Sequence, residues 1–148
     1  MEENFDMTVS IKEIIKYCDV DNENEENHFY FNIEDYQIYS REKMKFEFGY
    51  EDSFLNDTFN LRYIYHFIPV FQVCVCSKIR DFLLQENNKK ITKSIKNMNE
   101  SEVGGIFQKL YDYNYGFGHR WAKYIKKYKI EMAIQWCKEN NIQYKNDV

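Results

Sequence analysis

The hydrophobic pattern of the sequence changes its period near Pro69. Before this residue, short aromatic runs and segments of alternating apolar and polar residues are typical of strands that bury one face. The strand candidates are residues 28–31, 36–39, 43–48 and 59–67. Because the connections between them are short, they predict an antiparallel meander of three to four strands.

Helix signals lie on both sides of this region. Ser10 and Glu13 have the spacing of a capping box, which predicts a short helix over about residues 11–18. Pro69 is suited to the first position of a second helix, although residues 70–76 also fit a fifth strand. Further helices are expected over about residues 100–113, 119–128 and 131–140, the first of them capped by Asn99 with Glu102.

These elements predict a single α+β domain spanning residues 1–148. It has a short N-terminal helix, the antiparallel meander, and three to four helices packed on one sheet face. Aromatic residues make up 18% of the chain, so a core can form without disulfides or metals.

Neither an export signal nor a membrane segment is expected. The chain starts with acidic and polar residues, and its longest apolar-leaning run, Phe67 to Cys76, is shorter than the about 20 residues that cross a bilayer. We therefore expect a cytoplasmic protein of the producing or host cell, with its four cysteines reduced.

The net charge of −4 conceals a strong asymmetry along the chain. Residues 1–60 carry a net charge of −11, and residues 61–148 carry +7. The simplest interpretation is that the two halves pack together and neutralise each other. A homodimer would neutralise them equally well, and a charged partner is the other alternative.

The acidic half suggests one candidate site. Residues 19–27 predict an exposed acidic loop, and its carboxylates could bind a basic groove of a protein partner. The candidate partner-binding residues are Asp19, Asp21, Glu23, Glu25, Glu26, Glu34 and Asp35.

The basic half suggests a second candidate site. Residues 109–129 interleave cations, which bind phosphates, with aromatic rings, which stack on bases. On a helix, Trp121, Tyr124 and Tyr128 share one stripe, so the segment also fits an ordinary amphipathic helix with a basic exposed face. The candidate nucleic-acid-binding residues are His119, Arg120, Lys123, Lys126 and Lys127.

Catalytic and metal-binding patterns are weak. His66 and His119 would form a ribonuclease-like pair only if the fold brought them together. Cys74 and Cys76 supply two ligands where structural zinc needs four, and there is no phosphate-binding glycine loop. We therefore predict no metal, no cofactor and no enzymatic activity.

The leading hypothesis from the sequence is a small binding protein that inhibits a macromolecular partner. A nucleic-acid-processing enzyme is a suitable target, as for an immunity protein or an anti-defence protein of a phage or mobile element. The acidic half, the many tyrosines and the missing catalytic motifs support this hypothesis. The alternatives are a nucleic-acid-binding module and a small histidine-dependent nuclease.

Overall fold

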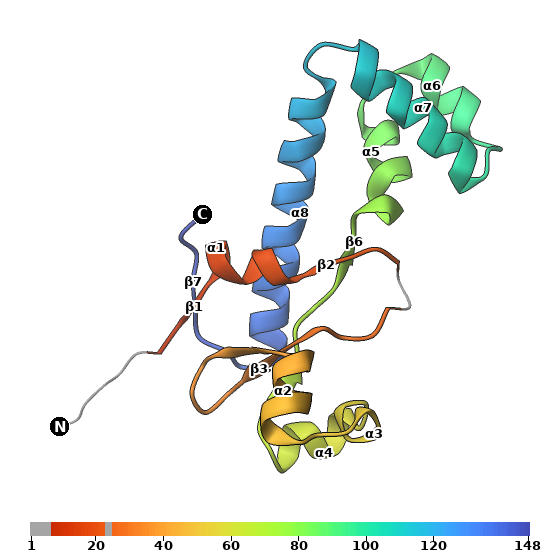
Figure 1. Cartoon of the computed structure of the whole chain (residues 1–148). Coiled ribbons are helices and arrows are strands. Elements are labelled where there is room, and N and C mark those ends of the chain that lie inside the picture. The colour runs from red at the N-terminus through yellow and green to blue at the C-terminus, as the bar shows by residue number, and fades with distance from the viewer. Residues whose placement is uncertain (1–6, 23–24) are drawn as a thin grey trace.

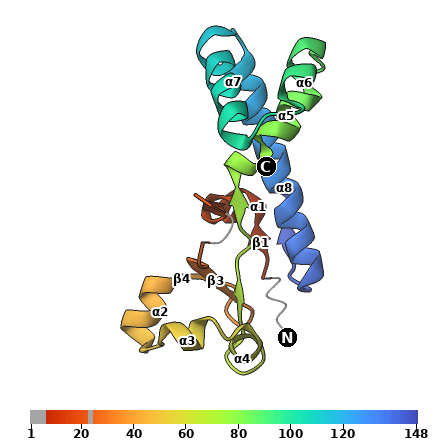
Figure 2. The same ribbon diagram turned by 90° about the vertical axis from the view of Figure 1, so that its right-hand side faces the viewer.

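A long helix, α8 (Phe117–Glu139), connects the two parts of this molecule (Figure 1). The structure is a computed structural model and describes residues 7–22 and 25–148. The first part, here called the helical lobe, comprises residues 75–127. The second part, the sheet lobe, comprises the other described residues. Figure 2 shows the same elongated arrangement from the side.

The sheet lobe is built on a three-stranded antiparallel sheet. β3 (Phe29–Asn32) lies between β4 (Ile38–Ser40) and β5 (Phe67–Pro69). Adjacent side chains of β3 pack into two different hydrophobic cores, because side chains along a strand alternate between its faces. Phe31 packs with Ile68 and with Trp136 of α8, whereas Tyr30 packs with Met44, Leu55 and Leu61.

Two short parallel strand pairs complete this lobe. β1 (Val9–Ser10) pairs with β7 (Tyr144–Lys145), and β2 (Asp19–Val20) pairs with β6 (Val73–Cys74). Between β1 and β2 lie α1 (Ile11–Ile14) and the 3-10 helix η1 (Ile15–Tyr17). The hydroxyl of Ser10 accepts a hydrogen bond from the backbone N–H of Glu13, so the predicted N-terminal cap is confirmed.

Two of the expected strands are helices. Residues 43–48 belong to α2 (Arg41–Phe48), and residues 59–63 belong to α4 (Thr58–Tyr63), with α3 (Asp52–Leu55) between them. Ser40 and Asp57 cap α2 and α4, and Gly49 ends α2 in the left-handed conformation. These local signals outweigh the alternation of apolar residues.

The helical lobe has a core of its own. It contains the 3-10 helix η2 (Val75–Lys78), α5 (Ile79–Gln85), α6 (Lys89–Ile95), α7 (Glu100–Tyr113) and the first half of α8. Its buried residues are Phe82, Leu83, Ile95, Val103 and Phe117. The capping box of Asn99 with Glu102 is confirmed at the start of α7.

Two other predicted helix boundaries are wrong. Pro69 ends β5 instead of starting a helix, and the competing strand prediction for residues 70–76 holds at Val73–Cys74. Predicted helices 119–128 and 131–140 are one helix, α8, because neither Lys129 nor Ile130 interrupts the helical pattern.

The predicted α+β class is confirmed, with a three-stranded antiparallel sheet followed by the helices α5–α8. The helices are distributed differently from the expectation of one covered face. α8 covers the face that carries Phe31, whereas α2–α4 cover the face that carries Tyr30. Among the described residues, no helix has the length and apolarity needed to cross a membrane.

The separate cores predict that the lobes differ in their response to a core mutation. Phe82→Ala should destabilise the helical lobe by about 3–5 kcal/mol, because it leaves a cavity beneath Trp121. Urea unfolding followed by Trp121 fluorescence, in a Trp136→Phe background, should show a lowered midpoint. The transition followed by Trp136, in a Trp121→Phe background, should shift much less.

Leu84→Ala is the matched control, since Leu84 lies on the same helix and is exposed. It should leave both midpoints nearly unchanged. Equal shifts of the Trp121 and Trp136 transitions in Phe82→Ala would mean instead that the two lobes unfold as one cooperative unit.

Candidate functional site

The turn between α7 and α8 forms a rigid corner at one end of the molecule (Figure 1). α7 ends at Tyr113, and the carbonyl of the next residue, Asn114, accepts a hydrogen bond of 3.2 Å from the N–H of Phe117. Gly116 has a φ of +85°, which glycine adopts without strain. This conformation reverses the chain within three residues and starts α8.

Aromatic packing holds the corner from beneath. Phe117 is buried, and its ring lies 5.3 Å from Phe82 and 5.4 Å from Phe107. On the outer side, the ring of Tyr111 lies against Gly118, where a Cβ would come within 3.2 Å of it. The absence of a side chain at Gly118 therefore allows α7 and α8 to approach closely.

The surface of the corner is aromatic and exposed. Tyr115 is fully exposed, and 88% of Tyr113 is exposed. Together with Tyr111 and His119, these residues line an open hollow of about 630 Å³. Asp112 and Asn114 add polar groups to its lining. The corner thus combines solvent-exposed aromatic rings with hydrogen-bonding groups.

The basic residues of α8 extend from this corner. His119, Lys123, Lys126 and Lys127 are exposed and occupy one side of the helix, because they are spaced by four, seven and eight positions. The opposite stripe with Trp121 and Tyr124 packs toward the lobe core, as the amphipathic pattern predicted. We call the four exposed residues the α8 basic face.

Arg120, another of the candidate nucleic-acid-binding residues, forms an internal ion pair. Its guanidinium forms hydrogen bonds with both carboxylate oxygens of Glu86, at distances of 2.8 to 3.1 Å. The hydrogen bond to Glu86 raises the pKa of Arg120. This pair ties the first turn of α8 to the end of α5, so Arg120 orients the corner instead of presenting a free cation.

The whole helical lobe is basic. Residues 75–127 hold eleven Lys/Arg and five Asp/Glu, a net charge of +6. Arg80 pairs with Glu100 and Arg120 with Glu86, which neutralises both arginines. In the part of the chain that the structure describes, no ion pair engages Lys123, Lys126 or Lys127. Their charges face solvent.

The predicted acidic site is largely tied into the fold. Asp19 pairs with Lys129 at 2.6 Å, and Glu34 pairs with His66 at 2.8 Å. Asp35 accepts hydrogen bonds from the hydroxyl of Tyr39 and the backbone N–H of Gln37. The hydrogen bond to Asp35 raises the pKa of Tyr39.

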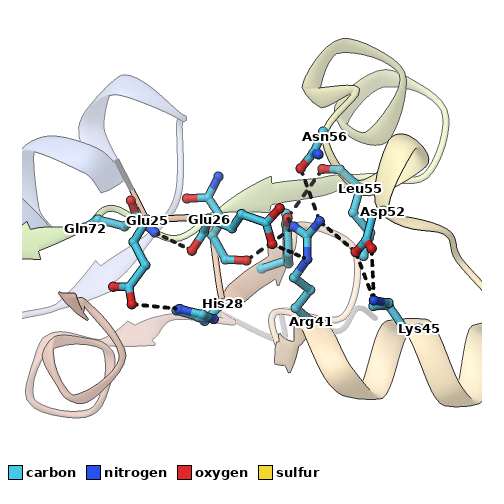
Figure 3. Close-up of polar contacts among 11 residues, drawn as sticks. Glu25, Glu26, His28, Arg41, Lys45, Asp52, Leu55, Asn56 and Gln72 are labelled. Carbon is cyan, nitrogen blue, oxygen red and sulfur yellow. Dashed lines mark hydrogen bonds and ion pairs between the residues drawn. The ribbon is translucent and has the colours of Figure 1, made fainter. Parts of the chain in front are cut away.

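The segment predicted as an exposed loop, residues 19–27, is anchored at both ends. Asp19 belongs to β2, and a carboxylate oxygen of Glu25 accepts a hydrogen bond from the backbone N–H of Asp21. The same carboxylate pairs with His28, and the carbonyl of Glu26 accepts a hydrogen bond from the side chain of Gln72 (Figure 3). Glu23 lies outside the described residues.

A buried arginine organises this region. Arg41 is 7% exposed, and its guanidinium donates to the hydroxyl of Tyr30 at 2.8 Å, to Asp52 at 3.1 Å and to Asn56 at 3.2 Å. Glu26 lies 3.6 Å from its Nε (Figure 3). Hydrogen bonds from Lys45 and Arg41 lower the pKa of Asp52. Arg41 thereby joins the acidic segment, the sheet and α3.

The two charged halves of the chain do not neutralise each other as expected. Among residues 7–22 and 25–148, the ion pairs between the halves are Asp19 with Lys129 and Glu34 with His66. The other ion pairs of the described residues form within one half. The two halves share the apolar core around Phe31 and Trp136, so they pack together through apolar contacts more than through ion pairs.

The histidines are not brought together. His66 precedes β5 in the sheet lobe, whereas His119 lies in the first turn of α8 in the helical lobe (Figure 1). Among the described residues, no group of three His, Cys, Asp or Glu side chains could hold a metal ion. Burial raises the pKa of Cys18 to about 12 and that of Cys137 to about 11, so both thiols are protonated at neutral pH.

Sequence reasoning missed an exposed apolar surface on α4. Phe59, Tyr63 and Ile64 are all exposed, and the rings of Phe59 and Tyr63 lie 4.8 Å apart. We call these three residues the α4 patch. The alternation of apolar residues predicts a strand over residues 59–67, on which Phe59 and Tyr63 would both face inward. The N-cap at Asp57 was the signal for a helix, on which both residues lie on one side.

Comparison of the chain with models of known protein families, with curated proteins and with solved structures found no match.

The Arg41 cluster predicts a specific stability change. Arg41→Ala should lower the free energy of unfolding by about 2–4 kcal/mol, because it leaves Tyr30 and the carbonyls around it without a donor. Urea unfolding measures this value. Lys43→Ala is the control on the same helix, since Lys43 forms an exposed pair with Glu47 worth about 0–0.5 kcal/mol. Similar losses in the two variants would show that Arg41 is no more than a surface cation.

Proposed function

We propose that this chain binds nucleic acid through the α8 basic face and the adjoining corner of the helical lobe. The observation that carries the proposal is a set of exposed lysines that form no ion pair with any described residue, beside exposed tyrosines, in a lobe of net charge +6. Lysines bind phosphates as point charges, and tyrosine rings stack on bases.

The overall negative charge does not oppose this function. Among the described residues of the acidic half, Asp19 is the one that forms an ion pair with α8, and its partner Lys129 is ten positions from His119. Ten residues of helix span about 15 Å. Because charges are screened over about 8 Å at physiological ionic strength, the corner experiences chiefly the charges of its own lobe.

The acidic surface supports a binding function less directly. Asp19, Glu26 and Glu34 each have an internal basic partner. A protein ligand would have to compete with these pairs, whereas a phosphate would meet Lys123 and Lys126 without displacing an ion pair of the described residues.

Replacing the α8 lysines tests the proposal. The triple variant Lys123→Gln/Lys126→Gln/Lys127→Gln should bind a fluorescein-labelled oligonucleotide about tenfold or more weakly at 50 mM salt. The slope of log affinity against log salt should become shallower by about two. Each phosphate contact releases counterions when the complex forms, so a variant with fewer contacts releases fewer of them. Fluorescence anisotropy at several salt concentrations measures both quantities.

The matched control removes the same charge elsewhere. Lys12, Lys138 and Lys145 are exposed lysines of the sheet lobe, and their triple Gln variant should keep the affinity and the salt slope. If the unmodified chain shows no salt-dependent binding at low salt, the proposed function is wrong. Equal losses in both triple variants would point to net charge alone.

A second candidate function is the inhibition of a protein partner, which the α4 patch favours. Phe59 is 69% exposed, and Phe46 on α2 of the same lobe is 84% exposed. Exposed aromatic residues are typical of surfaces that anchor a protein partner. The sheet lobe that carries them is acidic, so a basic partner is favoured.

A pull-down from the producing cell tests this second function. The tagged chain should retain a stoichiometric protein after nuclease treatment, and Phe59→Ser/Tyr63→Ser/Ile64→Ser should lose it, because the α4 patch supplies the apolar contact area. The triple Gln variant of the α8 lysines is the control and should keep this protein. Retention of the protein by the α4 variant would exclude the patch as the binding surface.

A further inference from the structure

The corner between α7 and α8 has features that the α8 lysines alone do not explain. Phosphate contacts need only exposed cations, yet Tyr113 is 88% exposed and Tyr115 fully exposed beside a hollow of about 630 Å³. Exposed aromatic rings gain hydrophobic stabilisation when a flat apolar group covers them, so their position at the rim of a hollow suits an occupant of that shape.

We propose that this corner binds an unpaired base of a single-stranded nucleic acid by stacking it on Tyr113 or Tyr115. The inference rests on the proposed function and specifies its ligand. The exposed ring faces provide the stacking surface, and the hollow, lined also by Tyr111 and His119, receives the base.

The charges around the corner match the backbone of such a strand. Lys123 lies one helical turn from His119 on α8, and Lys109 lies one turn from Tyr113 on α7. Both lysines are exposed, so a strand with a base in the hollow meets cations on either side. Asp112 and Asn114 can form hydrogen bonds with the edge of the base.

The corner is already in its binding shape. Phe117 anchors it to Phe82 and Phe107, and Arg120 fastens the first turn of α8 to Glu86. Little backbone entropy is lost when a base enters a rigid site. A duplex keeps its bases stacked on each other, so it offers no free ring face to Tyr113 and Tyr115.

The test compares single strands with a duplex. Binding of labelled dT12, U12 and a 12-base-pair DNA duplex is measured by anisotropy at 50 mM salt. Tyr113→Ala/Tyr115→Ala should weaken dT12 and U12 binding about tenfold or more, and change duplex binding less than about twofold. Both residues are exposed, so this variant should keep the fold and the unfolding midpoint.

Two controls separate stacking from other effects. Tyr113→Phe/Tyr115→Phe keeps the rings and should restore the affinity for dT12. Tyr65→Ala removes an exposed tyrosine of the sheet lobe and should keep the affinity for dT12. In addition, a single 2-aminopurine within dT12 should lose fluorescence on binding the unmodified chain and recover it in the Ala variant, because stacking quenches this base.

The outcomes distinguish the two proposals. If the unmodified chain binds neither strands nor duplex, the proposed function is wrong. If the lysine variant loses binding but the tyrosine variant binds dT12 and U12 normally, nucleic-acid binding stands and base stacking is overturned. If the tyrosine variant loses equal affinity for single strands and duplex, base stacking is also overturned. The same holds if that variant keeps its affinity for dT12 and U12 and loses only a protein that survives nuclease treatment in the pull-down. Ring-dependent binding supports the proposal, and the tighter of dT12 and U12 identifies DNA or RNA as the ligand.

Discussion

The helix α8 belongs to two hydrophobic cores, and the arrangement of the whole molecule depends on its continuity. Its first half places Phe117 and Trp121 in the helical lobe, and its second half places Ala133 and Trp136 against the sheet. The extended residues 70–74 form the other connection between the lobes (Figure 2). A break at residue 129 would let the lobes turn independently, whereas the unbroken helix sets their separation and keeps the acidic and basic surfaces apart.

This separation explains why a chain of negative net charge can present a basic surface. The corner lies at the end of α8 that is remote from the sheet, and it is held by Arg120 with Glu86 and by the packing of Phe117. In the proposed binding, a fixed aromatic surface would lose little entropy. The lysines of α8 would add attraction that depends on salt but hardly on sequence.

The sequence predicted helices better than strands, for a physical reason. Helix caps are local signals, so Ser10 with Glu13 and Asn99 with Glu102 could be identified directly. The alternation of Met44, Phe46 and Phe48 also satisfies a strand, and only the caps at Ser40 and Gly49 distinguish the helix. The α8 basic face was predictable from its helical spacing. The exposed tyrosines and the pairing of Arg120 with Glu86 were not, because both depend on how α5, α7 and α8 pack.

The use of the two basic residue types favours binding without sequence readout. All four arginines of the chain are engaged internally, Arg41 with Tyr30 and Asp52, Arg62 with Asn140, Arg80 with Glu100, and Arg120 with Glu86. The planar guanidinium is the group that reads guanine edges in a specific complex. The exposed cations of α8 are lysines, which bind phosphates as point charges. A surface of lysines and tyrosines therefore fits a strand by its charge and its ring faces, and is tolerant of its sequence.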